Sequence, residues 1–167
     1  LLGLLHLQQE VQRGKKTVLI PQEREVPQPV KRSSGVAANF LCDTSGYLLG
    51  VDTKGKPERT AECFAASRTL HEKILKEAQS LAARAVLAFY KHWNPQTAKD
   101  HPALKEEWDE VMKGGNLLFW YRGGPVTEDT QVRESWQHAN EQSGDAENPL
   151  CLVTGQHGPT ARLHPNI

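Results

Sequence analysis

The fold is decided by residues 57–93, PERTAECFAASRTLHEKILKEAQSLAARAVLAFYKHW, the strongest helical pattern in the chain. Pro57 is tolerated at the first helical position, and Glu58 suits the positive end of a helix dipole. Neither glycine nor proline follows up to residue 93. Two helical faces can be traced, and they comprise Cys63, Ser67, Leu70 and Ile74, then Ala78, Leu81, Ala85 and Phe89. The stripe shifts between residues 75 and 78, so the pattern predicts two helices or one bent helix.

Extended segments are predicted before this helical stretch. Residues 1–11 and 17–22 are typical of strands, and Gly14 between them allows the positive φ of a hairpin turn. Pro27 and Pro29 bias residues 23–31 towards extended backbone. Residues 36–41 are predicted as a short helix or strand, and residues 45–52 as a strand. This part of the chain is therefore expected to be rich in strands.

Helices and strands alternate after it. A helix is predicted over residues 101–112, a buried strand over 116–122, a helix over 127–142 and a strand over 148–155. The expected class is α+β, in a single domain of residues 1–167 that is an excerpt of a longer chain. It divides into a strand-rich basic part (1–57), a helical part (58–113) and a mixed part of strand and helix (114–167).

Charge and cysteine content narrow the function classes. The formal net charge is zero, which does not favour a general nucleic-acid binder. Residues 11–41, however, hold six lysines or arginines against two glutamates. Three scattered cysteines predict neither a disulfide framework nor a zinc site, so a reducing cytoplasm is expected. No apolar run is long enough to span a bilayer.

Two patterns in the sequence resemble enzyme sites, and each has a departure that argues against it. Residues 50–57, GVDTKGKP, resemble a phosphate-binding loop, but Pro57 stands where that loop needs a hydroxyl and a backbone N–H. Cys151 lies near His157 and His164 in sequence, as a nucleophile and its base would. The apolar strand pattern around Cys151 favours a small core residue instead, as it does for Cys42 and Cys63.

Other reactive or aromatic residues have ordinary structural interpretations. His71 and His92 lie along the helices without metal-ligand spacing, so no metal and no cofactor are expected. The carboxylate pairs are predicted on solvated surfaces; they are Glu106–Glu107, Asp109–Glu110 and Asp145–Glu147. The run of residues 118–121, LFWY, fits a buried strand better than a base-stacking surface.

A basic loop is the best candidate for binding. Residues 30–43, VKRSSGVAANFLCD, begin with two cations and two hydroxyls, and Gly35 permits close backbone approach. Such side chains contact phosphates, and the amide of Asn39 offers a donor and an acceptor to a base edge. The alternative is a capped helix start, with Ser34 as N-cap. The cations of the predicted hairpin turn form a second cluster in the same region.

Three stretches carry a resemblance to a known family. VKRSSGVAANFLCDTSGYLLGVD (30–52), GKPERTAECFAASRTLHEKIL (55–75) and NPLCLVTGQHGPTARLHPNI (148–167) resemble the large subunit of type I-C CRISPR surveillance complexes (Cascade), in its amino-terminal part. The resemblance implies a subunit that recognises the protospacer-adjacent motif in double-stranded DNA, assists duplex opening and recruits a helicase-nuclease. The resemblance implies that the subunit is not itself catalytic. It also implies a role in antiviral defence, together with partner subunits that carry the guide RNA.

Site residues follow from this resemblance as hypotheses. Asn39 is the candidate for a base edge, and the predicted DNA contacts comprise Lys15, Lys16, Lys31, Arg32, Ser33, Ser34 and Asn39. The wedge that parts the strands is not identified; Gln8, Gln9, Gln12 and Gln22 are unranked candidates. Two rival classes stay open. One is a structural module that docks against neighbouring subunits without reading DNA, and the other is a cysteine-dependent enzyme.

Overall fold

The computed structural model describes residues 2–4, 8–21, 24–33, 35–51 and 53–143. Its centre is strand β5 (Asn116–Tyr121), which pairs antiparallel with β1 (Leu2–Leu4), β4 (Cys42–Thr44) and β6 (Gly124–Pro125). Leu117, Leu118 and Phe119 of β5 are buried. The prediction of a buried strand at residues 116–122 is therefore confirmed, and so is the α+β class.

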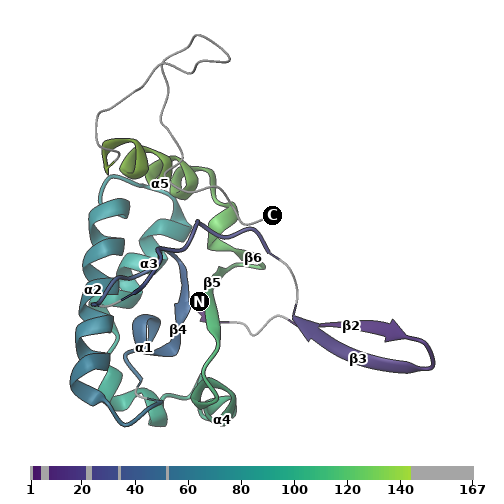
Figure 1. Ribbon diagram of the computed structural model, residues 1–167. Coiled ribbons are helices and arrows are strands. Elements are labelled where there is room, and N and C mark those ends of the chain that lie inside the picture. The colour runs from purple at the N-terminus through teal and green to yellow at the C-terminus, as the bar shows by residue number, and fades with distance from the viewer. Residues whose placement is uncertain (1, 5–7, 22–23, 34, 52, 144–167) are drawn as a thin grey trace.

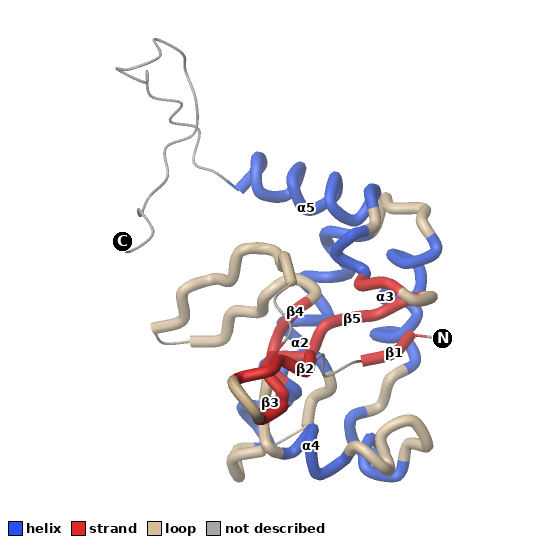
Figure 2. The backbone as a smooth tube through the Cα atoms, turned by 90° about the vertical axis from the view of Figure 1, so that its right-hand side faces the viewer, coloured by secondary structure: helices blue, strands red, loops and turns tan. Residues whose placement is uncertain are grey.

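The long helical stretch forms two helices, α2 (Pro57–Leu75) and α3 (Leu81–His92). Pro57 stands in the first turn of α2. The break falls where the apolar stripe shifts, and the Ser80 hydroxyl caps α3 by accepting the Ala83 N–H at 3.2 Å. Both helices flank the same side of the small sheet, with α5 across one end and α4 at the other (Figures 1 and 2).

The segment predicted as a strand at residues 45–52 is instead a short helix, α1 (Ser45–Leu48). That prediction was wrong because a short apolar run fits a buried helix turn as well as a strand. Leu48 and Leu49 are fully buried, and α1 packs against α2. Tertiary packing therefore decided the conformation here. Residues 36–41, predicted as a short helix or strand, have no regular structure.

The starts of two helices also differ from the predictions. Of residues 101–112 only α4 (Trp108–Met112) is an α-helix; turns precede it, and a 3-10 helix (Pro95–Asp100) lies further upstream. A 3-10 turn (Val126–Glu128) comes before α5 (Thr130–Ser143), because the Asp129 carboxylate caps the Val132 N–H at 3.1 Å. The strand predicted at 148–155 lies outside the described residues.

The predicted amino-terminal hairpin is confirmed, but the first strand is divided between two sheets. Strands β2 (Gln8–Arg13) and β3 (Lys16–Pro21) pair in register from Gln8↔Pro21 to Arg13↔Lys16, and Gly14 in the turn has φ +65°. β1 belongs to the central sheet instead. Figure 1 shows that the β2–β3 hairpin projects away from the helices and the central sheet.

The core lies between β5, α2 and α3 and is rich in contacts between rings. The His71 ring lies 5.1 Å from Phe40 and 4.9 Å from Tyr90, and Phe119 meets Tyr90 edge-on. Phe40, His71, Tyr90 and Phe119 are all at most 1% exposed. Within the described part of the chain, no helix has both the length and the apolar character needed to cross a membrane.

Candidate nucleic-acid interface

Asp43 organises the basic loop of residues 30–43. Its side chain is fully buried at the first residue after Cys42 in β4. Oδ1 accepts from the Arg32 Nη1 at 3.0 Å and from the Thr44 N–H at 2.8 Å. Oδ2 accepts from the Arg32 Nη2 and from the Asn39 N–H at 2.8 Å. These donors use the hydrogen-bonding capacity of a carboxylate, which is about four sites.

The Arg32 side chain bridges the buried Asp43 carboxylate and the backbone of Ala37 on the other side of the loop. Two guanidinium nitrogens pair with Asp43, while Nε donates to the Ala37 carbonyl at 2.5 Å. The guanidinium also lies over the Tyr47 ring, 4.0 Å from its centroid. Burial lowers the pKa of Arg32, but the hydrogen bond and charge of Asp43 raise it above its ordinary value. The guanidinium is thus a charged internal brace.

Further contacts close the 30–43 loop on itself and on α2. The Val30 N–H donates to Oδ1 of Asn39 at 2.9 Å, which joins the two ends of the loop. Arg59 of α2 donates to the carbonyl of Gly35, a residue with φ +86° at the exposed turn. The Ala37 N–H donates to the Tyr47 hydroxyl at 3.4 Å. The loop is therefore fastened at its base, middle and tip.

The predicted contact residues of this loop differ in what they leave accessible. Lys31 and Ser33 are exposed. Arg32 already holds Asp43, and Asn39 is half-buried with its side-chain oxygen in use. Within the described residues the Nδ2 group of Asn39 makes no hydrogen bond, so its two donors are unused there. Ser34 lies outside the described residues, and no helix begins there for it to cap.

The turn of the β2–β3 hairpin holds the second basic cluster. Arg13, Lys15 and Lys16 are all exposed. Among the described residues none of the three takes part in an ion pair with an acidic side chain. Leu19 is 62% and Val18 38% exposed on the two faces of the hairpin. A two-stranded hairpin with such exposed faces has little stability of its own.

The loop enters the core through a strained residue. Leu41 has φ +61°, and its N–H donates to Nε2 of His71 at 2.9 Å. Nδ1 of His71 then donates to the Ser67 carbonyl at 2.7 Å. Burial lowers the pKa of His71 to about 4, although the hydrogen bond to Ser67 and the charge of Asp43 oppose this. A neutral imidazole thus holds the left-handed turn, as expected of a satisfied structural histidine.

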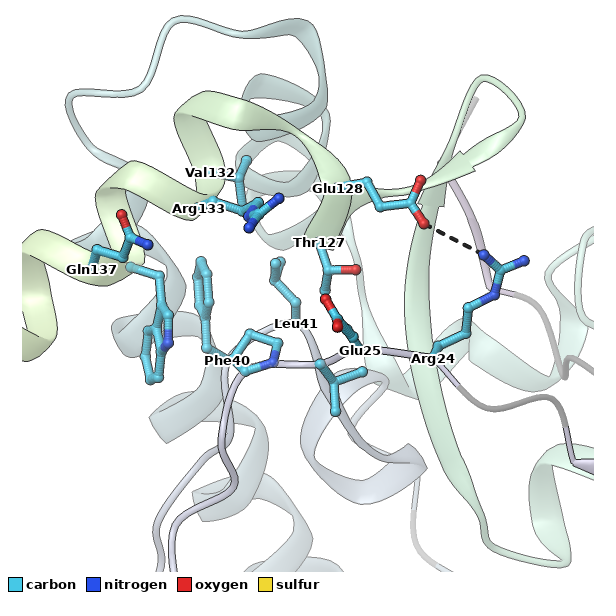
Figure 3. A pocket seen from close by; sticks show the side chains of 12 residues that line it. Arg24, Glu25, Phe40, Leu41, Thr127, Glu128, Val132, Arg133 and Gln137 are labelled. Atoms are coloured by element: carbon cyan, nitrogen blue, oxygen red, sulfur yellow. Dashed lines mark hydrogen bonds and ion pairs between the residues drawn. The ribbon is translucent and has the colours of Figure 1, made fainter. Parts of the chain in front are cut away.

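A pocket of about 410 Å³ lies between the extended segment that precedes the loop and helix α5 (Figure 3). Phe40, Leu41 and Val132 supply apolar walls, and an ion pair of 3.4 Å between Arg24 and Glu128 lies along one edge. Trp136 stacks on Phe40 at 5.0 Å. The Arg24–Glu128 pair attaches the segment before the loop to the 3-10 turn, and the Phe40–Trp136 stack attaches the loop itself to α5. Among the described lining residues no hydrogen bond joins a nucleophile to a base.

The enzyme-like candidates find no support among the described residues. No group of three or more histidine, cysteine, aspartate or glutamate side chains there is arranged to hold a metal. In the segment 50–57, Gly50 packs under Pro95 and Pro57 begins α2, while Asp52 lies outside the described residues. Cys63 is buried, whereas Cys42 is only half-buried. Cys151, His157, His164, Asp145 and Glu147 also lie outside the described residues, so the cysteine hypothesis is untested.

Two contributors to the loop were missed in the sequence. Asp43 reads as an ordinary polar residue after an apolar run, and its burial became visible only in the fold. Arg59 reads as a residue on the exposed face of α2, where it contacts the Gly35 carbonyl. The sequence hints at the buried ion pair only by placing Asp43 in the same segment as Arg32. That hint is too weak to identify a buried pair.

Taken together, the geometry defines an α+β protein with two exposed basic projections, a free hairpin and a braced loop. The family model for CRISPR-associated protein (Cas_Csd1) matches residues 2–167, so the chain belongs to this family. Its members are CRISPR-associated Cascade proteins, which confirms the family resemblance of the sequence. A search of curated proteins found no match.

Proposed function

We propose that this chain is a DNA-binding part of the large subunit of a type I-C CRISPR surveillance complex. In this proposal it recognises the protospacer-adjacent motif in double-stranded DNA, assists duplex opening and helps to recruit the helicase-nuclease. It acts in the cytoplasm with the other subunits and their guide RNA, and it is not itself an enzyme. The family supports a role in the CRISPR complex, and the basic projections support the DNA contact.

The observation that carries the proposal is the pair of accessible basic surfaces. Lys15 and Lys16 stand exposed at the end of a projecting hairpin, and Lys31 and Ser33 stand exposed on a loop that is already folded. A small number of phosphate contacts suits a protein that samples many sites, because each added contact strengthens non-specific binding. The zero formal net charge of the whole chain fits this economy of charge.

The proposal assigns different tasks to the predicted residues. Lys15, Lys16, Lys31 and Ser33 contact phosphates, and the Nδ2 donors of Asn39 meet a base edge. Arg32 was predicted to contact phosphate as well, but its guanidinium is bound to Asp43. In this proposal the amide meets the base edge in the minor groove, where one such contact distinguishes mainly A·T from G·C pairs, so tolerance for several related motifs is expected.

The test is duplex binding by the assembled complex that contains the full-length protein. Lys15→Ala/Lys16→Ala should weaken binding to targets with and without the motif. The slope of log K against log salt should then flatten by about 0.9 for each lost contact. Lys99→Ala/Lys105→Ala, which removes two exposed lysines near α4, is the matched control. If the two double variants reduce DNA affinity and the salt slope equally, the proposed DNA contact of the hairpin is contradicted.

Asn39→Ala tests base reading separately. It should reduce the preference for the motif while leaving the salt slope unchanged, because an amide carries no charge. The structural alternative, in which this region docks against neighbouring subunits, expects a different result. Complex assembly would then fail, whereas the DNA affinity of whatever complex forms would not depend on Lys31 or Asn39.

A further inference from the structure

Hydrogen bonds within the chain hold the described residues of the 30–43 loop, and several of these bonds converge on one buried carboxylate. Asp43 collects Arg32 and two backbone N–H groups, those of Asn39 and Thr44. The bond from Arg32 Nε to the Ala37 carbonyl joins the two sides of the loop. The exposed Lys31 and Ser33 flank the arginine on either side in the sequence. Their backbone positions therefore depend on where the Arg32 side chain is held.

We infer that Asp43, acting through Arg32, is the positioning residue of the DNA-contact loop and sets its preference for the protospacer-adjacent motif without touching DNA. This inference rests on the proposed function of the 30–43 loop. Ordering loop residues during binding costs free energy, so a loop that is ordered beforehand binds its target more tightly. A hydrogen bond to a base edge also requires an accurately placed side chain, whereas a mobile cation can still be attracted to a phosphate.

The charge balance makes the inference distinct from a general stabilising role. Arg32 has a side chain that is 27% exposed, while that of Asp43 is fully buried. Loss of the Asp43 charge would free a cation at the loop surface rather than remove one. The freed guanidinium would add a phosphate contact of its own. Motif preference should therefore fall while non-specific binding is kept or strengthened, a combination that simple unfolding does not produce.

The hydrogen bonds from backbone N–H groups to Asp43 allow a second, independent test of its positioning role. Asn39 and Thr44 each donate their N–H to Asp43. Asp43→Asn keeps one side-chain oxygen and replaces the other with an NH2 group that cannot accept, so one of these two amides loses its acceptor and its hydrogen exchange should accelerate. Amides of α3, such as that of Val86, belong to the core and should keep their protection if the fold is intact. Local loosening can thus be separated from global unfolding.

The experiment compares Asp43→Asn, Arg32→Lys and Lys31→Ala in the full-length protein within the assembled complex. Affinity is measured for duplexes with and without the motif at two salt concentrations, alongside hydrogen exchange. Asp43→Asn should lower the ratio of motif to non-motif affinity about tenfold, with the salt slope equal to or steeper than that of the parent. Arg32→Lys, which keeps the charge but loses the forked geometry, should show a smaller loss of the same ratio.

Each outcome is decisive. If Lys31→Ala flattens the salt slope while Asp43→Asn and Arg32→Lys leave the motif ratio unchanged, the loop binds DNA and the positioning role is wrong. If Lys31→Ala changes neither the slope nor the ratio, the proposed function of the loop fails, and the positioning role falls with it. If Asp43→Asn prevents assembly, Arg32→Lys decides, because it retains a charged partner for the carboxylate; an unchanged ratio in Arg32→Lys then overturns the inference.

Discussion

The two basic regions of this protein look alike in sequence and are opposite in construction. The 30–43 loop is bonded to β4, α1 and α2, and its last residues enter the core through Phe40 and Leu41. The β2–β3 hairpin pairs only with itself in its sheet and projects from the rest of the structure (Figure 1). Whether a basic side chain is engaged within the fold or accessible to a ligand therefore depends on the residues around it. Arg32 is part of the scaffold, while Lys15 and Lys16 are accessible.

Truncating an apolar side chain in each region should give the largest difference. Phe40 is 1% exposed between His71 and Trp136, so Phe40→Ala should lower the free energy of unfolding by about 3 to 5 kcal/mol. Leu19 on the hairpin is 62% exposed, so Leu19→Ala should change it by no more than about 0.5 kcal/mol. Denaturant titration measures both. Similar losses would mean that the hairpin packs as firmly as the loop.

Acid should loosen the anchor of the loop before it affects the hairpin. The pKa of His71 is about 4 in the folded protein and 6.5 in its ordinary state. The unfolded chain therefore binds the proton first. The contribution of neutral His71 is present above pH 6.5 and is lost as the pH falls towards 4, in total roughly 3 kcal/mol.

The measurement is the free energy of unfolding at several pH values between 7 and 4. His71→Gln should be less stable than the parent at pH 7 and should lose this part of the pH dependence. His92→Gln serves as the control, since His92 is exposed on the last turn of α3. A parent protein whose stability is flat from pH 6.5 to pH 4 would contradict the assignment of a neutral buried imidazole.

Two glycines with the same backbone conformation sharpen the contrast. Gly50 has φ +67°, and a Cβ there would lie 2.7 Å from Cγ of Pro95. Gly50→Ala should therefore cost about 2 to 3 kcal/mol of stability, from backbone strain and from crowding. Gly14 in the hairpin turn has φ +65° with open space around it, so Gly14→Ala should cost about 1 kcal/mol. Thermal unfolding of both variants provides the comparison.

Neutralising the hairpin turn should have the smallest effect on stability. Lys15→Ala/Lys16→Ala removes exposed charges from a region without ion pairs of its own among the described residues, so the free energy of unfolding should stay within about 0.5 kcal/mol of the parent. Circular dichroism melting is sufficient to test this. A larger loss would show that the hairpin cations stabilise the fold, which would weaken their assignment to DNA.

Prediction from sequence succeeded where the pattern was long and local. The periodicity of residues 57–93 located α2 and α3 and the break between them, and the β2–β3 hairpin and β5 were also predicted. It failed at α1 and over most of residues 101–112, where short apolar or charged segments suit several conformations. Among the predicted contact residues, it identified exposed Lys15, Lys16, Lys31 and Ser33, but it did not distinguish them from Arg32.

By itself, the sequence determined the helical middle, the hairpin turn, the α+β class and the family, because these depend on local periodicity or on an ordered string of residues. The tertiary structure alone decided which cation is engaged and which carboxylate is buried. Asp43 meets Arg32 only because β4 pairs with β5 and the loop folds back over α1. Burial and pairing arise from contacts between distant segments, and a linear pattern carries no information about the depth of a single charge.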